Sequence, residues 1–295
     1  MKALEGRLVA ISVSDAPDRA RLGFPQREID RALLSTCTAL VRAGAEIAYA
    51  GNLDPDGYTY KIFRHLAGAY AGSRDTPFHH FIPEPVARGT RFENLRAILD
   101  EGRGVVRTSI ARGDMLIPAR PSGKGIRLDE EVVLDDPQLA AWFAAAPNRP
   151  STEGFSAARR LVSERADARV IMGGKMGILS EPADTYAGAM PGIVEESIGT
   201  MEAGKPLVVL GSFGGAARDI AIALGLMDAG LKVPRGEQHA TYSQAISNVA
   251  KLADRIPGEL GADLAMIADD DRAEQNGFRV AAVIARWLSE KVEKT

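Results

Sequence analysis

The sequence predicts an α/β protein in which a doubly wound, mostly parallel sheet carries helices on both faces. Short, β-branched apolar runs alternate with longer stretches of helical periodicity, and this order is typical of strands joined by crossover helices. Two later apolar runs, RVIM and PLVVL, are followed by the glycine-rich turns GGKMG and GSFGG. Open parallel sheets place such turns at the carboxyl ends of their strands, where ligands bind.

Alternating strands and helices are predicted in the first part of the chain. Leu8 to Val13 is expected to form a first buried strand that leads into the polar pair Ser14–Asp15. Helical spacing of apolar residues indicates the helices, and short apolar runs bounded by turn residues indicate the strands. In order, we expect a strand at 8–13, a helix at 25–42, a strand at 46–50, a helix at 59–71 and a strand at 78–82.

The second half continues this order after a less regular segment. Residues 84–150 mix charges with short apolar pieces and a Pro/Gly-rich stretch, IPARPSGKG. We expect an elaboration there, with one short helix at 139–145, inside a single domain that spans 1–295. The other expected elements are a helix at 155–165, strands at 168–172 and 207–210, and helices at 193–201, 217–226 and 281–292.

The composition is that of an ordinary globular protein. Of 295 residues, 45% are hydrophobic and 25% are charged, and the net charge is −3. Nucleic-acid-binding proteins usually carry a basic excess, so nucleic acid is not an expected partner. The single cysteine, Cys37, excludes an internal disulfide, and no apolar run approaches the ~20 residues of a membrane span. We expect a cytoplasmic protein without membrane contact.

Polar residues and glycines follow the first two predicted strands. Hydroxyl and carboxylate groups there suit a phosphate or a ribose, although the same residue types also cap helices and form plain turns. Gly51 would let the backbone approach a ligand closely. The candidate ligand contacts in this part are Ser12, Ser14, Asp15, Gly51, Asp54 and Thr59.

Two glycine-rich turns supply the second group of candidates. Adjacent glycines allow positive φ angles and present backbone N–H groups, which favour an anion at the start of a helix. The spacing of a P-loop is missing, and a connecting turn with a solvated lysine is the alternative. The candidate ligand contacts here are Gly173, Gly174, Lys175, Gly211, Ser212, Phe213, Gly214 and Gly215.

A Pro-Gly-x-x-Glu-Glu element lies between the two turns. Pro191 and Gly192 suit a helix start, and Glu195 and Glu196 fall in its first turn, where acids are favourable without any chemistry. A carboxylate at this place could also hold a ribose hydroxyl, stabilise an oxocarbenium-like centre or activate a water during N-glycosidic cleavage. Both interpretations stay open on the sequence.

No metal site is expected. His79 and His80 are adjacent on a predicted strand, so their side chains face opposite sides and cannot chelate one ion together. His65 and His239 are isolated in the sequence.

The segments ISVSD, YAGNLDPDGYT, ARVIMGGKMG, PGIVEES and GKPLVVLGSFGGAARDIA together resemble the SLOG superfamily. This Rossmann-like group includes Lonely Guy phosphoribohydrolases, DprA and the ligand-sensing domains of Thoeris effectors and TRPM-type channels. The resemblance covers residues 7–75 and 155–225 and is nearest to prokaryotic members in conflict and nucleotide-signalling systems. It implies a Rossmann-like fold and a nucleotide ligand.

The hydrolase motif of this superfamily is only partly present. Lonely Guy enzymes carry PGGxGTxxE, and here Pro191 and Gly192 match whereas Ile193 replaces the second glycine. The Gly-Thr pair is absent, which implies a changed phosphate cradle and moves the expected pocket to the GSFGG turn. The family's helical arginine corresponds to Arg159 or Arg160, and we take Arg160 as the catalytic candidate.

The resemblance implies a sensor that binds an ADP-ribose-like or NAD-like ligand, in anti-phage defence or nucleotide signalling. Such a sensor is expected to form a homo-oligomer or to act on a partner effector protein, with no cofactor other than its nucleotide. The alternative is a nucleotide N-glycosidase or glycosyl transferase that uses Glu195 or Glu196. A structural partner in a larger complex is the third possibility.

Overall fold

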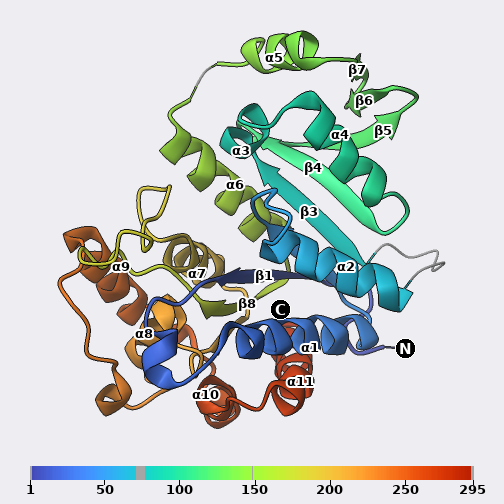
Figure 1. Ribbon diagram of the computed structural model, residues 1–295. Helices are drawn as coiled ribbons and strands as arrows, with labels where there is room; N and C mark the ends of the chain where they lie inside the picture. The colour runs from blue at the N-terminus through green and yellow to red at the C-terminus, as the bar shows by residue number, and fades with distance from the viewer. Residues whose placement is uncertain (1, 71–76, 148, 294–295) are drawn as a thin grey trace. The chain divides into compact units, whose positions relative to one another are not determined.

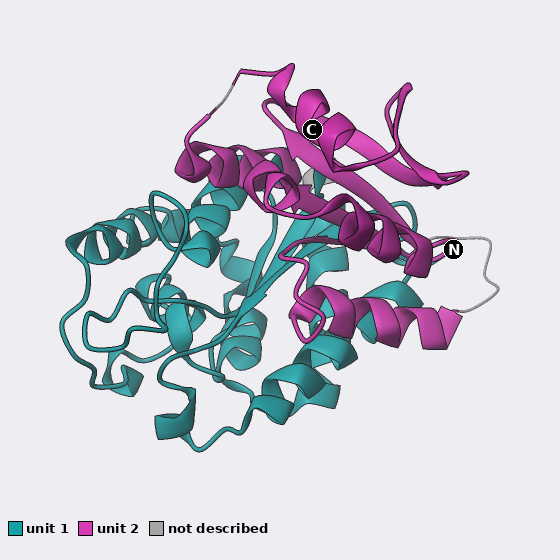
Figure 2. Cartoon of the chain, turned by 45° about the horizontal axis from the view of Figure 1, so that its top comes forward, with its two compact units in different colours: residues 1–45, 163–295 teal, residues 46–162 magenta. Residues whose placement is uncertain are grey.

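The computed structural model describes residues 2–70, 77–147 and 149–293. The chain divides into two compact units: unit 1 comprises residues 1–45 and 163–295, and unit 2 comprises residues 46–162 (Figure 2). Most strand pairs are parallel and helices alternate with strands, so the predicted α/β, Rossmann-like fold class is confirmed. The single domain expected for 1–295 stays a prediction. No helix among the described residues is long and apolar enough to cross a membrane.

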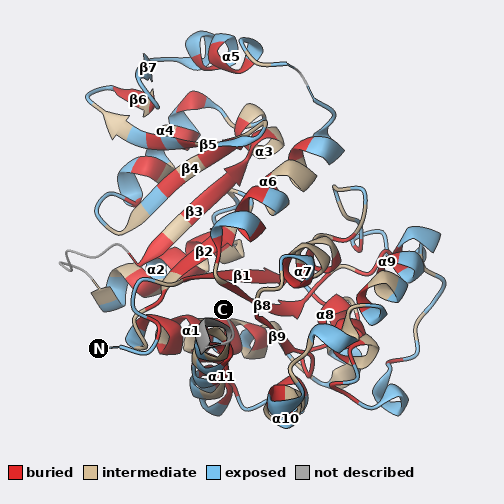
Figure 3. Cartoon of the chain, turned by 180° about the vertical axis from the view of Figure 1, so that it is seen from behind, coloured by how far each residue is buried: buried red, intermediate tan, exposed pale blue. Residues whose placement is uncertain are grey.

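Unit 1 is built on three parallel strands. Strand β1 (Leu8–Ser14) pairs with β8 (Ala168–Gly173), which pairs in turn with β9 (Leu207–Leu210). All residues of these strands are buried except Ser14, which is half-buried (Figure 3). Strands that are buried on both faces have continuous apolar sequences, which explains why these three are so clear in the sequence.

Helices cover both faces of these strands. Helix α7 (Gly192–Glu202) lies on one side, whereas α1 (Gln26–Arg42) and α11 (Ala273–Glu293) lie on the other (Figures 1 and 3). Helix α8 (Gly215–Ala223) follows β9 and packs against β8 and β9. Unit 1 also contains α9 (Ala240–Ala250) and α10 (Gly261–Asp269), which the sequence analysis does not predict.

The C-terminal helix α11 begins eight residues earlier than the predicted start at 281. Gly277 lies inside this extension, and glycine lowers helix propensity by about 1 kcal/mol relative to alanine. Its lack of a side chain allows close packing on α1, because a Cβ atom there would lie 2.9 Å from the carbonyl oxygen of Ser35. Tertiary packing therefore outweighs the local propensity of this segment.

Unit 2 begins with three parallel strands, β2 (Glu46–Ala50), β3 (Phe78–Pro83) and β4 (Val106–Arg112). An antiparallel meander continues the same sheet from β4. Its strands are β5 (Met115–Ser122), β6 (Gly125–Leu128) and β7 (Glu131–Val133). The expected elaboration at 84–150 thus contains four strands that the sequence analysis does not predict.

Prolines inside a strand and very short turns explain why the meander is hard to predict from the sequence. Two prolines, Pro118 and Pro121, lie inside β5 and cannot donate backbone hydrogen bonds, so the segment does not look like an inner strand. The three connections are short, and Gly113, Gly123 and Asp129 adopt the positive φ angles that tight hairpins require. Asp129 is the only described non-glycine residue with such an angle.

Three helices of unit 2 pack an apolar core against this sheet: α3 (Glu84–Arg88), α4 (Phe92–Glu101) and α5 (Asp136–Ala144). Unit 2 also contains α2 (Tyr58–Tyr70) and α6 (Ser151–Arg165), the last of which leads the chain into unit 1. Residue 71, the predicted end of α2, lies outside the described residues. The core contains Leu95, Ile110, Leu128 and Trp142.

The two adjacent histidines of β3 face opposite sides, as predicted. His79 contacts Glu46, whereas His80 is fully buried and its pKa is lowered to about 4 by desolvation. The unfolded histidine takes up a proton near pH 6.5, so between pH 6.5 and pH 4 the unfolded state binds more protons than the folded state. Stability is therefore lost as the pH falls through this window.

Acidification from pH 7 to pH 4 should cost about 3 kcal/mol of stability through His80 alone. The measurement is urea unfolding at several pH values for wild type and for His80→Leu. Other titrating groups contribute equally to both proteins, so the difference between their free energies of unfolding reports on His80. The stability difference between the two proteins should shift in favour of the variant as the pH falls. His79→Leu is the matched control on the opposite face, and equal pH dependence of wild type and His80→Leu would contradict the assignment.

Candidate functional site

The carboxyl ends of β1, β8 and β9 meet at one edge of unit 1. Ser14 is aligned with Gly173 across the β1–β8 pair, and Met172 is aligned with Leu210 across the β8–β9 pair. Ser14 is half-buried and Asp15 is exposed, so both are open to a ligand from solvent. This edge is where open parallel sheets bind ligands, and it gathers most of the residues predicted from the sequence.

The Gly173–Gly174 turn is shaped by tight backbone packing. The N–H of Gly174 donates to the carbonyl of Ser14 at 3.1 Å, and both glycines have positive φ angles, +65° and +112°. A Cβ atom on Gly173 would lie only 2.1 Å from the carbonyl oxygen of Ser14. On Gly215, the first residue of α8, it would lie 2.6 Å from the carbonyl carbon of Gly173. The glycines are therefore required for the turns to pack together.

Helix α7 begins beside this turn, and its N-cap residue, Pro191, makes no side-chain cap hydrogen bond. The helix itself starts at Gly192. A Cβ atom on Gly174 would lie 3.1 Å from Cδ1 of Ile193, so the first turn of α7 packs directly on the glycine turn. A helix start at a strand edge favours an anion.

Lys175 is half-buried and directly follows the glycine turn. Its Nζ donates to the carbonyl of Ala183 at 2.9 Å, which ties the side chain to the loop between β8 and α7. In the same loop, the Asp184 carboxylate accepts hydrogen bonds from the N–H groups of Met176 and Ile178. The loop is therefore held in shape by its own polar groups.

The start of α8 is capped from within the protein. The Gly215 N–H donates to Oδ1 of Asp18 at 2.6 Å, and Asp18 is 2% exposed. A Cβ atom on Gly214 would lie 2.5 Å from the same oxygen, and Gly214 has a φ angle of +84°. The carboxylate of Asp18 thus occupies the place at which an anionic ligand would meet this helix dipole.

The rest of the GSFGG turn is buried and bonded internally. The Ser212 hydroxyl donates to the carbonyl of Asp270 at 3.0 Å, and the Phe213 ring packs on Phe24 with 5.5 Å between ring centroids. A Cβ atom on Gly211 would lie 2.6 Å from Sδ of Met227. The expected ligand contacts of this turn stay predictions, and its geometry favours a structural role.

A buried charge network lies behind Asp18, and the sequence analysis does not identify it. Arg235 forms ion pairs with Asp219 at 2.8 Å and with Asp18 at 3.6 Å. The Tyr242 hydroxyl donates to Asp219 at 2.8 Å, and burial beside that carboxylate raises the pKa of Tyr242 well above its ordinary value. The network fixes α8 to α9 and to the loop that contains Asp18.

Arg169 on β8 is a second residue that the sequence analysis misses. It is 1% exposed, and its guanidinium donates to the hydroxyls of Ser12, Ser163 and Thr200 at 2.6–2.9 Å. Its NH1 atom lies 3.2 Å from Oε2 of Glu196. A charged residue inside the apolar run ARVIMG is the signal that could have revealed it, because a buried arginine needs partners.

Two predicted site residues therefore have clear internal partners. Ser12 faces Arg169 inside the unit, and Glu196 pairs with the same guanidinium. Glu195 is half-buried in the first turn of α7. Of the paired carboxylates, Glu196 has the geometry of a structural ion pair, whereas Glu195 lies nearer to the helix start.

The remaining candidates belong to unit 2. The Thr59 hydroxyl donates to the carbonyl of Asn52 at 2.7 Å, and Asp54 accepts from the N–H of Asp56 at 3.0 Å. Gly51 is required for packing, because a Cβ atom there would lie 2.2 Å from Cε1 of Tyr49. Arg160 on α6 pairs with Asp114 at 2.6 Å. The expected ligand or catalytic roles of these residues stay predictions.

Comparison with known proteins identifies the family. The sequence profile of the family described as SLOG cluster2 matches residues 3–256, which is most of the chain. A search of curated proteins gives no match. The matched region includes the three parallel strands, the two glycine turns and the start of α7. The chain therefore belongs to the SLOG cluster2 family, and this membership indicates nucleotide-related binding or glycosidase-type function.

Proposed function

We propose that this protein binds a nucleotide-derived ligand, with an ADP-ribose-like or NAD-like body, at the edge of unit 1 where β1, β8 and β9 end. The observation that carries the proposal is the start of α7 beside the Gly173–Gly174 turn, where the N-cap residue Pro191 makes no side-chain cap hydrogen bond. The protein then acts as a sensor in anti-phage defence or nucleotide signalling, through a homo-oligomer or a partner effector protein.

The phosphate is proposed to sit at α7, whereas the sequence favoured the GSFGG turn. Two helices begin at this edge, but the first N–H of α8 already donates to Asp18. The N-cap residue of α7, Pro191, makes no side-chain cap hydrogen bond, and the N–H groups and dipole of this helix favour negative charge. Lys175 follows the adjacent turn and supplies a positive charge that a phosphate attracts.

The ribose is proposed to contact the polar side chains around the same helix start. Ser14 and Asp15 lie at the open end of β1, and Glu195 is half-buried in the first turn of α7. A carboxylate that accepts hydrogen bonds from a ribose diol is a common way to recognise nucleotides. These three side chains support binding of the sugar, with the phosphate at the N-terminus of α7.

The alternative is a nucleotide N-glycosidase that uses Glu195, and the half-buried position of this carboxylate favours it. The ion pair of Glu196 favours the sensor instead, because a carboxylate paired with the buried guanidinium of Arg169 has a structural role. The pairing of Glu196 therefore leaves Glu195 as the candidate catalytic carboxylate. We favour the sensor, and product analysis separates the two functions.

A thermal-shift screen against AMP, ADP-ribose, NAD and cyclic nucleotides tests binding. Ligand at 100 times its dissociation constant should add about 2.7 kcal/mol of apparent stability. Lys175→Met should weaken binding of AMP by about tenfold or more but leave adenosine unaffected, since adenosine has no phosphate for Lys175 to contact and the lost bond to the carbonyl of Ala183 affects both ligands alike. Lys251→Met, directly after the end of α9, is the control. A screen without any shift, or equal losses for adenosine and AMP, contradicts the proposed site.

Glu195→Gln distinguishes a sensor from an enzyme. If Glu195 holds a ribose hydroxyl, the variant should lose about 1.5–3 kcal/mol of binding free energy, and the wild type should release no free base. Chromatography of wild-type reactions with NAD and AMP detects nicotinamide or adenine. Release of base by the wild type, lost in a variant that still binds, would establish the N-glycosidase instead.

A further inference from the structure

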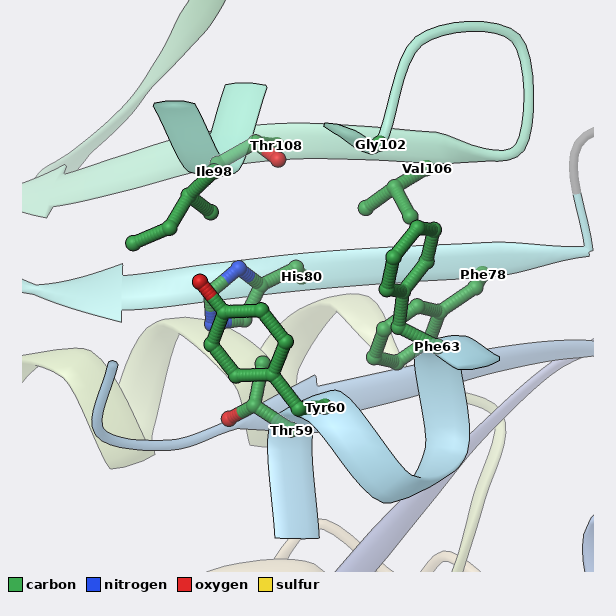
Figure 4. A pocket seen from close by; sticks show the side chains of 9 residues that line it. All are labelled: Thr59, Tyr60, Phe63, Phe78, His80, Ile98, Gly102, Val106 and Thr108. Carbon is green, nitrogen blue, oxygen red and sulfur yellow. The ribbon is translucent and has the colours of Figure 1, made fainter. Parts of the chain in front are cut away.

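A hollow on the surface of unit 1 lies between α10 and α11, which pack side by side (Figure 1). It holds about 230 Å³ of free space, whereas the hollow beside His80 in unit 2 holds only about 20 Å³ (Figure 4). A cavity of about 150 Å³ can hold a benzene ring, so the hollow in unit 1 has room for an aromatic side chain. Its apolar lining comes from Met266 and Ile267 on α10 and from Ala282 and Val283 on α11.

An exposed aromatic ring lies next to this hollow on the same helix. Phe278 of α11 is 61% exposed, and it is the one aromatic residue among the large exposed hydrophobic residues of the described chain. It precedes Ala282 by four residues, so the two side chains are neighbours on the helix surface. Met266, across the hollow on α10, is itself 51% exposed. An aromatic side chain and a hollow that fits such a side chain therefore lie side by side, and aromatic anchors of this kind dominate protein–protein binding.

The opposite face of α11 is already used inside unit 1. It packs on α1, where Gly277 lies against Ser35, and Trp287 is buried. The face with Phe278 and Ala282 is therefore the part of the helix that is left for a partner outside the chain.

The charges around the hollow are balanced, and this indicates which partner fits. Arg286 forms an ion pair with Asp263, and Arg279 forms one with Asp270. These pairs give the rim both signs and no net charge, so a strongly charged partner gains nothing here, whereas an identical face meets no net repulsion. A ring, a hollow that fits it and balanced charges on one surface make that surface complementary to itself. Interfaces across a two-fold axis have this property, because residue i contacts j and j contacts i.

We propose that the face formed by α10 and α11 joins two copies of this chain into a two-fold dimer, in which Phe278 of each copy enters the hollow of the other. Each ring lies against Met266 and Ala282 of the other copy, so one dimer removes both exposed rings from water. The inference names the interface of the homo-oligomer in the proposed function. It rests on the surface of these two helices alone, so nucleotide binding and dimer formation are tested separately.

The mass of the protein in solution tests the dimer. Wild type at micromolar concentration should sediment as a species of twice the chain mass in analytical ultracentrifugation. Phe278→Asp should raise the dissociation constant of the dimer at least about a hundredfold, because both aromatic contacts are lost. Met115→Asp is the matched control, since Met115 is 63% exposed but lies in unit 2, and it should leave the dimer intact. A monomeric wild type, or equal effects of the two substitutions, would overturn the proposal.

A mixture of two variants shows whether the ring and the hollow come from different copies. Phe278→Asp puts a carboxylate in place of the ring, and Met266→Lys puts an ammonium group in the hollow. Both positions are exposed, so neither substitution disturbs the core, and circular dichroism checks the fold. Each variant alone should dimerise more weakly than wild type. The equimolar mixture should form heterodimers, because one contact then pairs the new charges and the other keeps Phe278 against Met266. A mixture that stays monomeric would contradict the reciprocal contact.

Discussion

Arg169→Met should lower the free energy of unfolding by about 3–5 kcal/mol, because removing one partner of a buried ion pair leaves the other uncompensated. Methionine fills a similar volume but donates no hydrogen bond. The variant therefore leaves Glu196 without its cation and removes the donor from the hydroxyls of Ser12, Ser163 and Thr200. Urea unfolding followed by circular dichroism measures the loss.

Arg7→Met is a matched control, because it also removes one cation from an ion pair but does so at the surface. Arg7 pairs with Asp167 at 3.2 Å, but its side chain is 42% exposed. Arg7→Met should therefore cost at most about 1 kcal/mol, as for other surface pairs. If both variants lose the same stability, Arg169 is not the organising residue of β8 and α7 that its contacts indicate.

Gly173→Ala should destabilise unit 1 by about 3 kcal/mol or more. A Cβ atom would lie 2.1 Å from the backbone oxygen of Ser14, and the φ angle of +65° is unfavourable for alanine. Backbone atoms cannot move aside as a flexible side chain can, so β1 and β8 must separate locally. Thermal unfolding together with urea titration gives the magnitude.

Gly261→Ala is the control for this substitution. Gly261 starts α10 with helical φ and ψ angles, and a Cβ atom there meets no described atom within 4 Å. The change should be neutral or slightly stabilising, because alanine restricts the unfolded chain more than glycine does. A small effect at Gly173, comparable with that at Gly261, would show that the two turns do not pack as tightly as described.

The sequence predicts the parallel strands of both units well because local pattern and tertiary environment agree there. LVVL at 207–210 and EIAYA at 46–50 are strands with the predicted bounds. The meander is missed because Pro118 and Pro121 contradict the usual signals of an inner strand. Helix α11 is predicted too short because Gly277 has low helix propensity but packs closely on α1.

The candidate site is predicted as a set of positions rather than as a set of contacts. Glycines after strands are visible in the sequence, and they do lie at the carboxyl edge of unit 1. The sequence cannot show that Asp18, nearly 200 residues away in the chain, caps α8. Nor does it show that Glu196 pairs with Arg169. Both facts depend on long-range packing. The first changes which helix start suits a phosphate, and the second gives Glu196 a structural partner.

The position of the phosphate in a crystal structure of the nucleotide complex decides between the helix starts of α7 and α8. The ligand is the one that gives the largest thermal shift in the screen. We predict a phosphate within hydrogen-bond distance of the N–H groups at the start of α7, with Asp18 still bonded to Gly215. A phosphate at the start of α8, with Asp18 displaced, would contradict the proposed site at α7.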